Sequence, residues 1–258
     1  MSPIVILSFF IPLIGTALGS AMVFFLKNEI NVKVKKVLMG FASGVMIAAS
    51  IWSLLQPAIQ SYEKSDFRMW LVPMIGFIVG VGFMLLLDYL IPHMHLNKQE
   101  EGVSGEGLSQ TFKMLLAVTL HNIPEGLAAG VVIAGMMNNS LSEHAMLALS
   151  IGLAIQNFPE GIIVSGPLLE EGMPKWKAFL FGTLSGVVEP IASLLAIGFT
   201  MLVTTILPYV LAFAAGVMIF VVVEELIPEA NEGTHSNLAT IGLAVGFALM
   251  MCLDIALG

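Results

Sequence analysis

The sequence has few charged residues and a single cysteine. Charged side chains make up 11% of the 258 residues and apolar residues 57%, whereas charged residues make up about 25% of an average soluble domain. Cys252 has no second cysteine to pair with, which excludes an internal disulfide. The chain also has no motif that resembles a nucleotide-binding loop, which argues against ATP hydrolysis. These absences exclude an ordinary soluble domain and favour a protein embedded in a membrane.

Long apolar runs take up most of the chain. About 20 residues at a rise of about 1.5 Å cross the hydrocarbon layer of a bilayer. The first run follows no basic region and has no clear cleavage site, so we interpret it as a membrane span and not as a signal peptide. The runs leave no room for a soluble domain, which predicts one all-α integral membrane domain over residues 1–258. The eight predicted segments cover roughly 4–26, 37–56, 71–92, 112–137, 144–168, 178–203, 207–228 and 238–257.

The basic residues indicate how these segments are oriented. With eight segments, the loops on one side hold only Lys64 and Arg68 of the ten basic residues. Cytoplasmic loops carry the excess of Lys and Arg, so both termini are predicted to be extracytoplasmic. The other eight basic residues lie on the predicted cytoplasmic side: Lys27, Lys33, Lys35, Lys36, Lys98, Lys113, Lys175 and Lys177.

The two ends of the chain repeat each other. The second segment contains Phe-Ala-Ser-Gly-Val-Met-Ile at 41–47, which returns as Phe-Ala-Ala-Gly-Val-Met-Ile at 213–219 in the seventh. The third segment ends with Leu-Leu-Asp at 86–88, and the eighth contains the similar Cys-Leu-Asp at 252–254. These matches predict that the second and third segments correspond to the seventh and eighth.

Two further matches complete the pattern. Gly-Thr at 15–16 and at 182–183 would pair the first segment with the sixth. The fourth and fifth segments share a hexapeptide, His-Asn-Ile-Pro-Glu-Gly at 121–126 and Gln-Asn-Phe-Pro-Glu-Gly at 156–161. An odd offset between repeats reverses their direction across the membrane. The chain is therefore predicted to form a 3+2+3 inverted repeat, which is typical of transporters with a site at the membrane midplane.

The first hexapeptide places polar groups on one face of an apolar helix. His121 and Glu125 are four residues apart and project from nearly the same face, which Asn122 borders. Pro124 has no N–H and therefore opens the helix backbone. A charged side chain at the centre of a bilayer costs roughly 2.5–3.5 kcal/mol. This cost indicates a functional role for the carboxylate.

The second hexapeptide and the sixth segment add further acids and amides. Gln156, Asn157 and Glu160 repeat the first arrangement, and Glu189 precedes a proline in the sixth segment. None of the ten basic residues is placed to reach Glu125, Glu160 or Glu189. The three carboxylates must therefore be protonated, solvated or neutralised by a bound cation, and a divalent cation is the simplest solution. Imidazole together with carboxylates suits zinc, iron and similar ions, whereas calcium or magnesium sites use oxygen ligands alone.

These residues resemble the ZIP (Zrt/Irt-like protein) family of divalent metal transporters, and in detail its bacterial GufA-like branch. The resemblance covers the hexapeptide pair, Glu189 with the proline after it, and the number of spans. It implies two metal positions that the glutamates bridge. The first metal would meet Met46, His121, Glu125, Gln156, Glu160 and Glu189, and the second Asn122, Glu125, Asn157, Glu160 and Glu189. Many members of the family carry His in place of Gln156 or Asp in place of Asn157. For Met46, apolar packing is the alternative interpretation.

The resemblance also implies the activity. It implies a secondary transporter in a bacterial or archaeal cell (inner) membrane. The transporter would move Zn²⁺, or Cd²⁺, Fe²⁺, Mn²⁺ or Co²⁺, into the cytoplasm. The lipid bilayer and the ion would be its partners, without an organic cofactor or a nucleic acid, and a homodimer stays open. The first, fourth, fifth and sixth segments would shift against the rest. A metal exit route is implied at Asp88, His93, His95, Glu224 and Glu225, for which solvated helix ends are the alternative interpretation.

Two other functions fit the sequence less well. An intramembrane metalloprotease would need the motif H-E-x-x-H, with two histidine ligands and a glutamate base. Here the histidine precedes the glutamate, and the predicted spans contain no second histidine near it. A proton-coupled carrier of organic solutes could use the acids as relays, but no basic group lies next to the acids of the fourth to sixth segments to bind such a solute. We therefore expect a transporter and not an enzyme.

Overall fold

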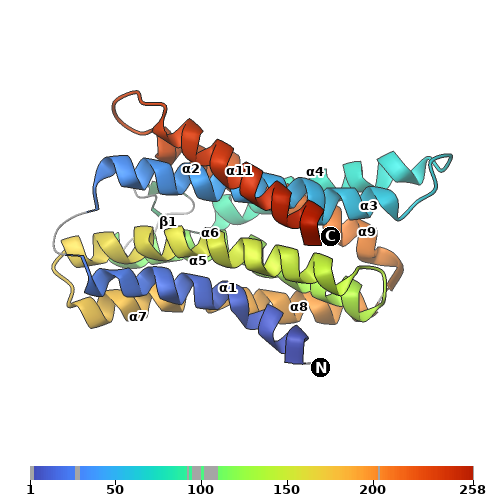
Figure 1. The fold of residues 1–258 in the computed structure, drawn as a ribbon, viewed down its shortest axis with the longest axis horizontal. Coiled ribbons are helices and arrows are strands. Elements are labelled where there is room, and N and C mark those ends of the chain that lie inside the picture. The colour runs from blue at the N-terminus through green and yellow to red at the C-terminus, as the bar shows by residue number, and fades with distance from the viewer. Residues whose placement is uncertain are drawn as a thin grey trace.

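The computed structural model describes residues 3–26, 30–91, 93–94, 100–101, 110–202 and 204–257, and nearly all of them are helical (Figure 1). Seven helical segments of this described part are long and apolar enough to cross a membrane. Helix α5 is not among these seven, but its 28 residues match the length of α6. The long helices are α1 (Pro3–Ala21), α2 (Val32–Ala49), α4 (Arg68–Leu90), α5 (Gln110–Met137), α6 (Glu143–Glu170), α7 (Lys175–Ser185), α8 (Val188–Leu202), α9 (Leu207–Val221) and α11 (Leu238–Leu257).

Short elements extend or connect these helices. The all-α membrane fold class is confirmed, and two-residue strands are its one departure in the described residues. The short elements are η1 (Met22–Phe24), η2 (Ser50–Leu55), α3 (Gln56–Gln60), β1 (His93–Met94), β2 (Glu100–Glu101), η3 (Thr204–Ile206), η4 (Val222–Leu226) and α10 (Ile227–Asn231). Strands β1 and β2 pair in antiparallel fashion.

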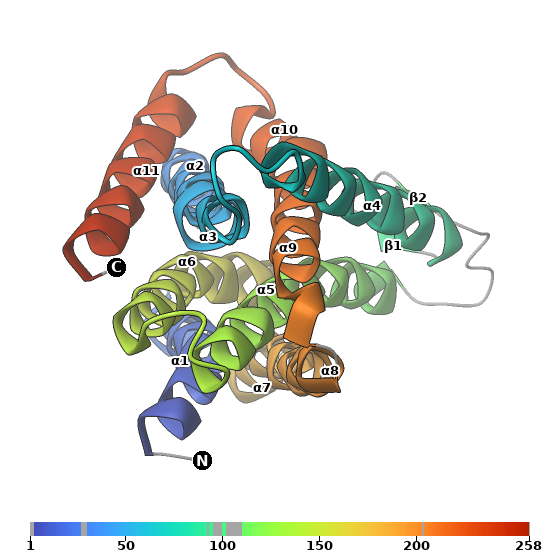
Figure 2. The same ribbon diagram turned by 90° about the vertical axis from the view of Figure 1, so that its right-hand side faces the viewer.

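The helices form two layers, which Figure 2 shows end on. Helices α2, α4, α9 and α11 form one layer, and α1, α5, α6, α7 and α8 form the other. The main contacts between the layers are those of α2 with α6 and of α5 with α9. Both termini lie at the same end of the molecule (Figure 1), as an even number of spans requires.

Glycines bring the helices of each layer into close contact. The most extensive pairings are α2 with α11, α4 with α9, α1 with α6, and α5 with α8. A Cβ atom on Gly44 would lie 2.1 Å from the carbonyl oxygen of Leu243, and one on Gly126 would lie 2.4 Å from that of Glu189. Small residues allow helix backbones in a membrane to approach this closely. Larger side chains at these positions would force the paired helices apart.

The same contacts reveal the inverted repeat in three dimensions. Gly44 of α2 meets the carbonyl of Leu243 in α11, and its sequence counterpart Gly216 of α9 meets the carbonyl of Phe77 in α4. The α2–α11 and α9–α4 packings are therefore equivalent, as the sequence predicts. The inverted-repeat architecture is confirmed for the outer repeats at the level of individual backbone contacts.

One of the sequence matches needs correction. Gly161 of α6 meets the carbonyl of Thr16, and its counterpart Gly126 of α5 meets the carbonyl of Glu189. Thr16 in α1 is therefore equivalent to Glu189 in α8. The sequence match that paired Thr16 with Thr183 is wrong, because a Gly-Thr dipeptide is too short a signal to fix the register of a whole helix.

Three spans are interrupted where the sequence predicts continuous segments. The second and seventh spans pass through π-helical turns, η2 and η4, and each turn is followed by a helix with proline in its first turn. The sixth span breaks at a turn over residues 186–187, between α7 and α8. This break places Glu189 in the first turn of α8, where the helix dipole stabilises negative charge.

Candidate metal site

Polar side chains converge inside the layer that contains α1, α5, α6 and α8. Glu125 is 1% exposed, Glu189 2% and Glu160 9%, so the three carboxylates are buried. They share this site with three amides and one hydroxyl: Asn122, Gln156, Asn157 and Thr16. Pro124 and Pro159 lie within α5 and α6, where each removes a backbone N–H from the helix beside the site.

Gln156 links the glutamates of the two hexapeptides. Its Nε2 donates a hydrogen bond to Glu125 Oε1 at 2.8 Å and a second, short one to Glu160 Oε1. Gln156 Oε1 and Glu125 Oε2 are buried and accept no hydrogen bond within the described chain. One neutral amide therefore lies between two carboxylates.

The two asparagines make equivalent hydrogen bonds. Asn122 Nδ2 donates to the carbonyl of Ser185 at 3.0 Å, and Asn157 Nδ2 donates to the carbonyl of Pro12 at 3.4 Å. Ser185 and Pro12 occupy equivalent positions in the repeat, because each lies four residues before one of the paired positions 189 and 16. Each amide nitrogen thus donates to a backbone carbonyl, and both Oδ1 atoms stay available to another partner.

Thr16 and Glu189 meet where the two repeats join. Thr16 Oγ1 donates to Glu189 Oε1 at 3.0 Å, and Glu189 Oε2 accepts no hydrogen bond within the described residues. Because these two positions are equivalent, their contact lies on the axis that relates the repeats. Sequence reasoning missed Thr16, because the Gly-Thr match assigned it a different partner. Its position in the first apolar segment, next to Gly15, was the only signal available.

The site contains buried oxygens that need a partner. A buried polar group without one costs about 1–3 kcal/mol, and an ion or a water usually explains it. Within the described residues, however, no three His, Cys, Asp or Glu side chains are arranged as a metal-binding cluster. The ligand oxygens are present, but Gln156 lies between the carboxylates that a metal would bridge. The oxygens without hydrogen bonds are those of Asn122 (Oδ1), Glu125 (Oε2), Gln156 (Oε1), Asn157 (Oδ1) and Glu189 (Oε2).

His121 lies toward the other layer of the molecule. Its Nε2 contacts Oε2 of Glu225, which is 3% exposed and belongs to η4. The sequence assigned His121 to the metal site and Glu225 to an exit route, and the structure joins the two. This contact connects the hexapeptide of α5 with the layer that contains α9.

The remaining predicted residues lie outside this group. Met46 is fully buried in the apolar core around α2. Asp88 is partly buried near the end of α4, and Glu224 is exposed next to Glu225. His95 lies outside the described residues, as does the side chain of His93. The structure therefore brings together the predicted acids and amides, whereas the roles of Met46 and of the exit residues stay predictions.

Known proteins resemble this chain over nearly its whole length. Residues 95–254, which include both hexapeptides and Glu189, match a family model described as "ZIP Zinc transporter". Zinc transporter ZIP11 of Xenopus tropicalis is 36% identical, with 94% of each chain covered. Zinc transporter ZIPB of Bordetella bronchiseptica is 37% identical over 95% of this chain and 78% of the relative. Zinc transporter GufA of Myxococcus xanthus is 33% identical over 95% of this chain and 96% of the relative.

Proposed function

The chain belongs to the ZIP zinc transporter family, and on this basis we propose that it moves Zn²⁺ or a related divalent transition-metal ion into the cytoplasm as a secondary transporter. The protein is a multi-pass membrane protein whose relatives are named as zinc transporters and not as enzymes. Zinc is therefore the first ion to test. The inward direction, the finer choice of metal, the cell membrane as location and a two-metal centre belong to the proposal.

The observation that carries this proposal is the group of buried oxygens where the repeats meet. Glu125 and Glu160 accept hydrogen bonds from the same amide of Gln156, and all three carboxylates, including that of Glu189, are buried. No lysine or arginine of the described chain forms a hydrogen bond or ion pair with them. A divalent cation would neutralise these charges and satisfy the oxygens that accept no hydrogen bond. Inverted-repeat transporters place their substrate sites in this position.

Gln156 suggests how the ion enters the first metal position. In the structure its NH₂ group donates to both glutamates. A metal could not bind in this arrangement, because the NH₂ group offers it no lone pair. Rotation of the amide would turn Gln156 Oε1 toward the ion and release Glu125 and Glu160 as ligands. We infer that the ion, when it binds, replaces the two hydrogen bonds that Gln156 donates to Glu125 and Glu160.

His121 connects ion binding with the two layers. If His121 binds the first metal together with Met46 and the glutamates, its imidazole must leave Glu225. Breaking this contact loosens the connection between α5 and η4. Binding of the ion would therefore favour movement of the layer that contains α1, α5, α6 and α8 relative to the other layer. Such a movement supplies a physical basis for alternating access.

The asparagines and the glutamates would hold the second metal.

Metal uptake into proteoliposomes tests the proposal. We expect Glu125→Ala and Glu160→Ala each to abolish Zn²⁺ uptake while the protein still inserts into the bilayer, because each removes a carboxylate that would bridge both metals. Glu143→Ala is the matched control, since Glu143 is an exposed glutamate on the same helix as Glu160. It should transport at the wild-type rate. Wild-type uptake by either site variant at equal protein content would contradict the proposed site.

A further inference from the structure

An apolar groove opens between the two layers of the molecule. Its volume is about 410 Å³. Helices α4 and α9 of one layer line one side of it, and α5 and α8 of the other layer line the opposite side (Figure 2). The lining residues include no charged side chain, and Tyr209 is the one polar side chain among them. They include Ile75 and Val79 of α4, Leu127 of α5, Leu195 and Phe199 of α8, and Tyr209 of α9.

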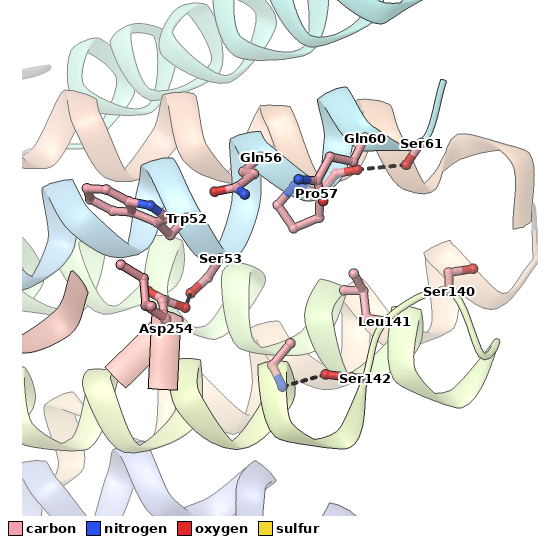
Figure 3. Close-up of a pocket in the computed structure, with 12 residues that line it drawn as sticks. Trp52, Ser53, Gln56, Pro57, Gln60, Ser61, Ser140, Leu141, Ser142 and Asp254 are labelled. Atoms are coloured by element: carbon pink, nitrogen blue, oxygen red, sulfur yellow. Dashed lines mark hydrogen bonds between the residues drawn. The ribbon is translucent and has the colours of Figure 1, made fainter. Parts of the chain in front are cut away.

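This groove differs from the polar cavity at the end of the molecule that holds the termini. Figure 3 shows that cavity, which is lined by hydroxyls, amides and the carboxylate of Asp254. Ser53 Oγ donates a hydrogen bond to Asp254 Oδ1 there at 2.6 Å. Such walls suit water and ions, whereas a polar ligand in the groove would lose its hydrogen bonds to water and gain almost none. The groove therefore suits an apolar ligand.

Two tightly packed helix pairs form the sides of the groove. A Cβ atom on Gly76 of α4 would lie 2.6 Å from the carbonyl oxygen of Tyr209 in α9. A Cβ atom on Gly130 of α5 would lie 2.4 Å from that of Ser193 in α8. Helix α9 also packs against α5, but in the described part of the chain α4 packs against neither α5 nor α8. The groove is the space that this missing contact leaves open.

The other half of the inverted repeat makes the contact that is missing here. Helix α11 is the counterpart of α4, and α6 is the counterpart of α5. Helix α11 packs against α6, where a Cβ atom on Gly152 would lie 2.2 Å from Met250 Sδ. Among the described residues, α4 makes no comparable contact with α5. The surroundings of the protein, and not a neighbouring helix, must therefore fill the groove.

The surroundings at this depth are the hydrocarbon of the bilayer. Helices α4, α8 and α9 belong to candidate membrane spans, and Val79 and Leu195 are 55% and 68% exposed. An empty gap would lose the dispersion contacts of its lining. A cavity of about 150 Å³ with similar walls holds one benzene ring, so on that scale about 410 Å³ holds roughly fifteen carbons. This is the size of one acyl chain of a membrane lipid.

Polar side chains near one end of the groove indicate the direction of such a lipid. Arg68 begins α4 and precedes Ile75 by seven residues, which places it on nearly the same face and about 10 Å nearer the end of the span. Tyr209 lies near the start of α9. Tyrosine and arginine are typical of the headgroup level of a membrane. Arg68 pairs with Asp66, but an exposed pair of this kind contributes little, so a phosphate could share the guanidinium.

We propose that the groove binds one acyl chain of a phospholipid whose phosphate lies near Arg68. The basic residues predict that this end is extracytoplasmic, so the lipid belongs to that leaflet. Its chain contacts both layers and stabilises their present arrangement. Leu127 directly follows the hexapeptide of α5, so the chain also contacts the helix that carries Glu125. Lipid binding does not rest on the proposed transport function, but an effect of the lipid on transport does.

Val79→Trp tests the site, because an indole at this position fills the groove. Native mass spectrometry measures how much 1-palmitoyl-2-oleoyl phosphatidylglycerol the purified protein retains in detergent. We expect about one lipid per wild-type chain and an affinity about tenfold lower in Val79→Trp. Ile78→Trp is the matched control, since Ile78 is 61% exposed on the same helix and does not line the groove. Equal retention by the two variants would overturn the site.

Leu195→Trp repeats this test from the α8 side, with Leu194→Trp as its control. Leu194 is similarly exposed and does not line the groove. Light scattering on the same samples reports the oligomeric state. If Val79→Trp and Leu195→Trp changed the oligomeric state and not the lipid content, the groove would be an interface between copies of the chain, and the lipid proposal would be wrong.

Arg68→Gln tests the position of the phosphate. We expect its affinity for phosphatidylglycerol to fall about threefold and its affinity for a diacylglycerol with the same chains to stay unchanged. Lys64→Gln is the control, because Lys64 is the other basic residue predicted at this end. Equal losses in Arg68→Gln and Lys64→Gln would overturn the contact between Arg68 and the phosphate.

Zn²⁺ should weaken lipid binding if the layers move as proposed, because the lipid stabilises the arrangement in which His121 contacts Glu225. Coupling between two ligands is reciprocal, and we expect lipid affinity to fall about fivefold with Zn²⁺, the low end of such effects. The difference should vanish in Glu125→Ala. Equal lipid affinity with and without Zn²⁺ would contradict the proposed movement and leave the lipid site in place. Equal lipid retention by Val79→Trp and Ile78→Trp, with zinc uptake intact, would overturn the lipid site and leave the proposed function in place.

Discussion

The hexapeptides of α5 and α6 are similar in sequence, but their first residues make different contacts. In both copies the asparagine donates to an equivalent carbonyl and the glutamate accepts from Gln156. His121, however, contacts Glu225 in the other layer, whereas Gln156 stays between the carboxylates. The repeat fixes the backbone and the acids, and the exchange of histidine for glutamine at the first position gives the two copies different contacts.

This difference follows from the chemistry of the two side chains. An amide supplies two N–H donors and can satisfy two carboxylates at once, whereas a neutral imidazole supplies one donor and one acceptor. Hydrogen bonds to charged groups contribute roughly 1.5–3 kcal/mol. Gln156 therefore stabilises the adjacent glutamates without a metal. His121 is left to connect the α5 copy with η4.

The largest effect that would test this division is expected for His121→Ala. Removing the imidazole should weaken Zn²⁺ uptake by about tenfold or more and Mn²⁺ uptake less, because nitrogen ligands favour the later ion in the series. Competition between Zn²⁺ and Mn²⁺ in proteoliposomes measures the ratio. Gln156→Ala should affect both ions similarly, since an amide oxygen discriminates less between them.

Glu225→Gln is the second variant in this comparison. It changes the partner of His121 and leaves the imidazole in place. Equal losses for both metals in His121→Ala and in Glu225→Gln would mean that His121 serves only the contact between layers and is not a metal ligand.

A smaller effect should show that the rest of the two hexapeptides is equivalent. Asn122→Ala and Asn157→Ala each remove one Oδ1 and leave one backbone carbonyl without its donor. A lost hydrogen bond costs about 1 kcal/mol, so we expect metal affinity to fall about fivefold in each variant. Isothermal titration with Zn²⁺ measures both. A large effect at only one asparagine would contradict equivalence and would place the second metal nearer to that copy.

Sequence reasoning predicted the all-α membrane fold and the inverted repeat, and it predicted the buried acids and amides because polar residues in apolar segments are a strong local signal, whereas the exact bounds of the spans stay predictions. It could not predict the contact of His121 with Glu225, since that contact joins two helices far apart in the chain. The role of Thr16 was lost to a false dipeptide match, which only the packing of Gly161 corrects. The prolines that follow η2 and η4 are visible in the sequence, but the π-helical turns before them depend on packing.

The smallest expected effect belongs to Gln156→His, which would make the two hexapeptides alike at their first position. A histidine cannot donate to both Glu125 and Glu160, so the bridge between the carboxylates would be lost and a nitrogen donor for zinc would be gained. We expect Zn²⁺ affinity to rise by less than about fivefold, which is below about 1 kcal/mol. Transport should become no faster, because a tighter site releases its ion more slowly into the cytoplasm. Isothermal titration and uptake kinetics should therefore show a lower dissociation constant, a lower apparent KM and an unchanged or reduced maximal rate. Gln156→Ala is the control, since it removes the bridge without adding a ligand. If Gln156→His bound zinc no better than Gln156→Ala, residue 156 would point away from the metal, and the equivalence of the two copies would end at this position.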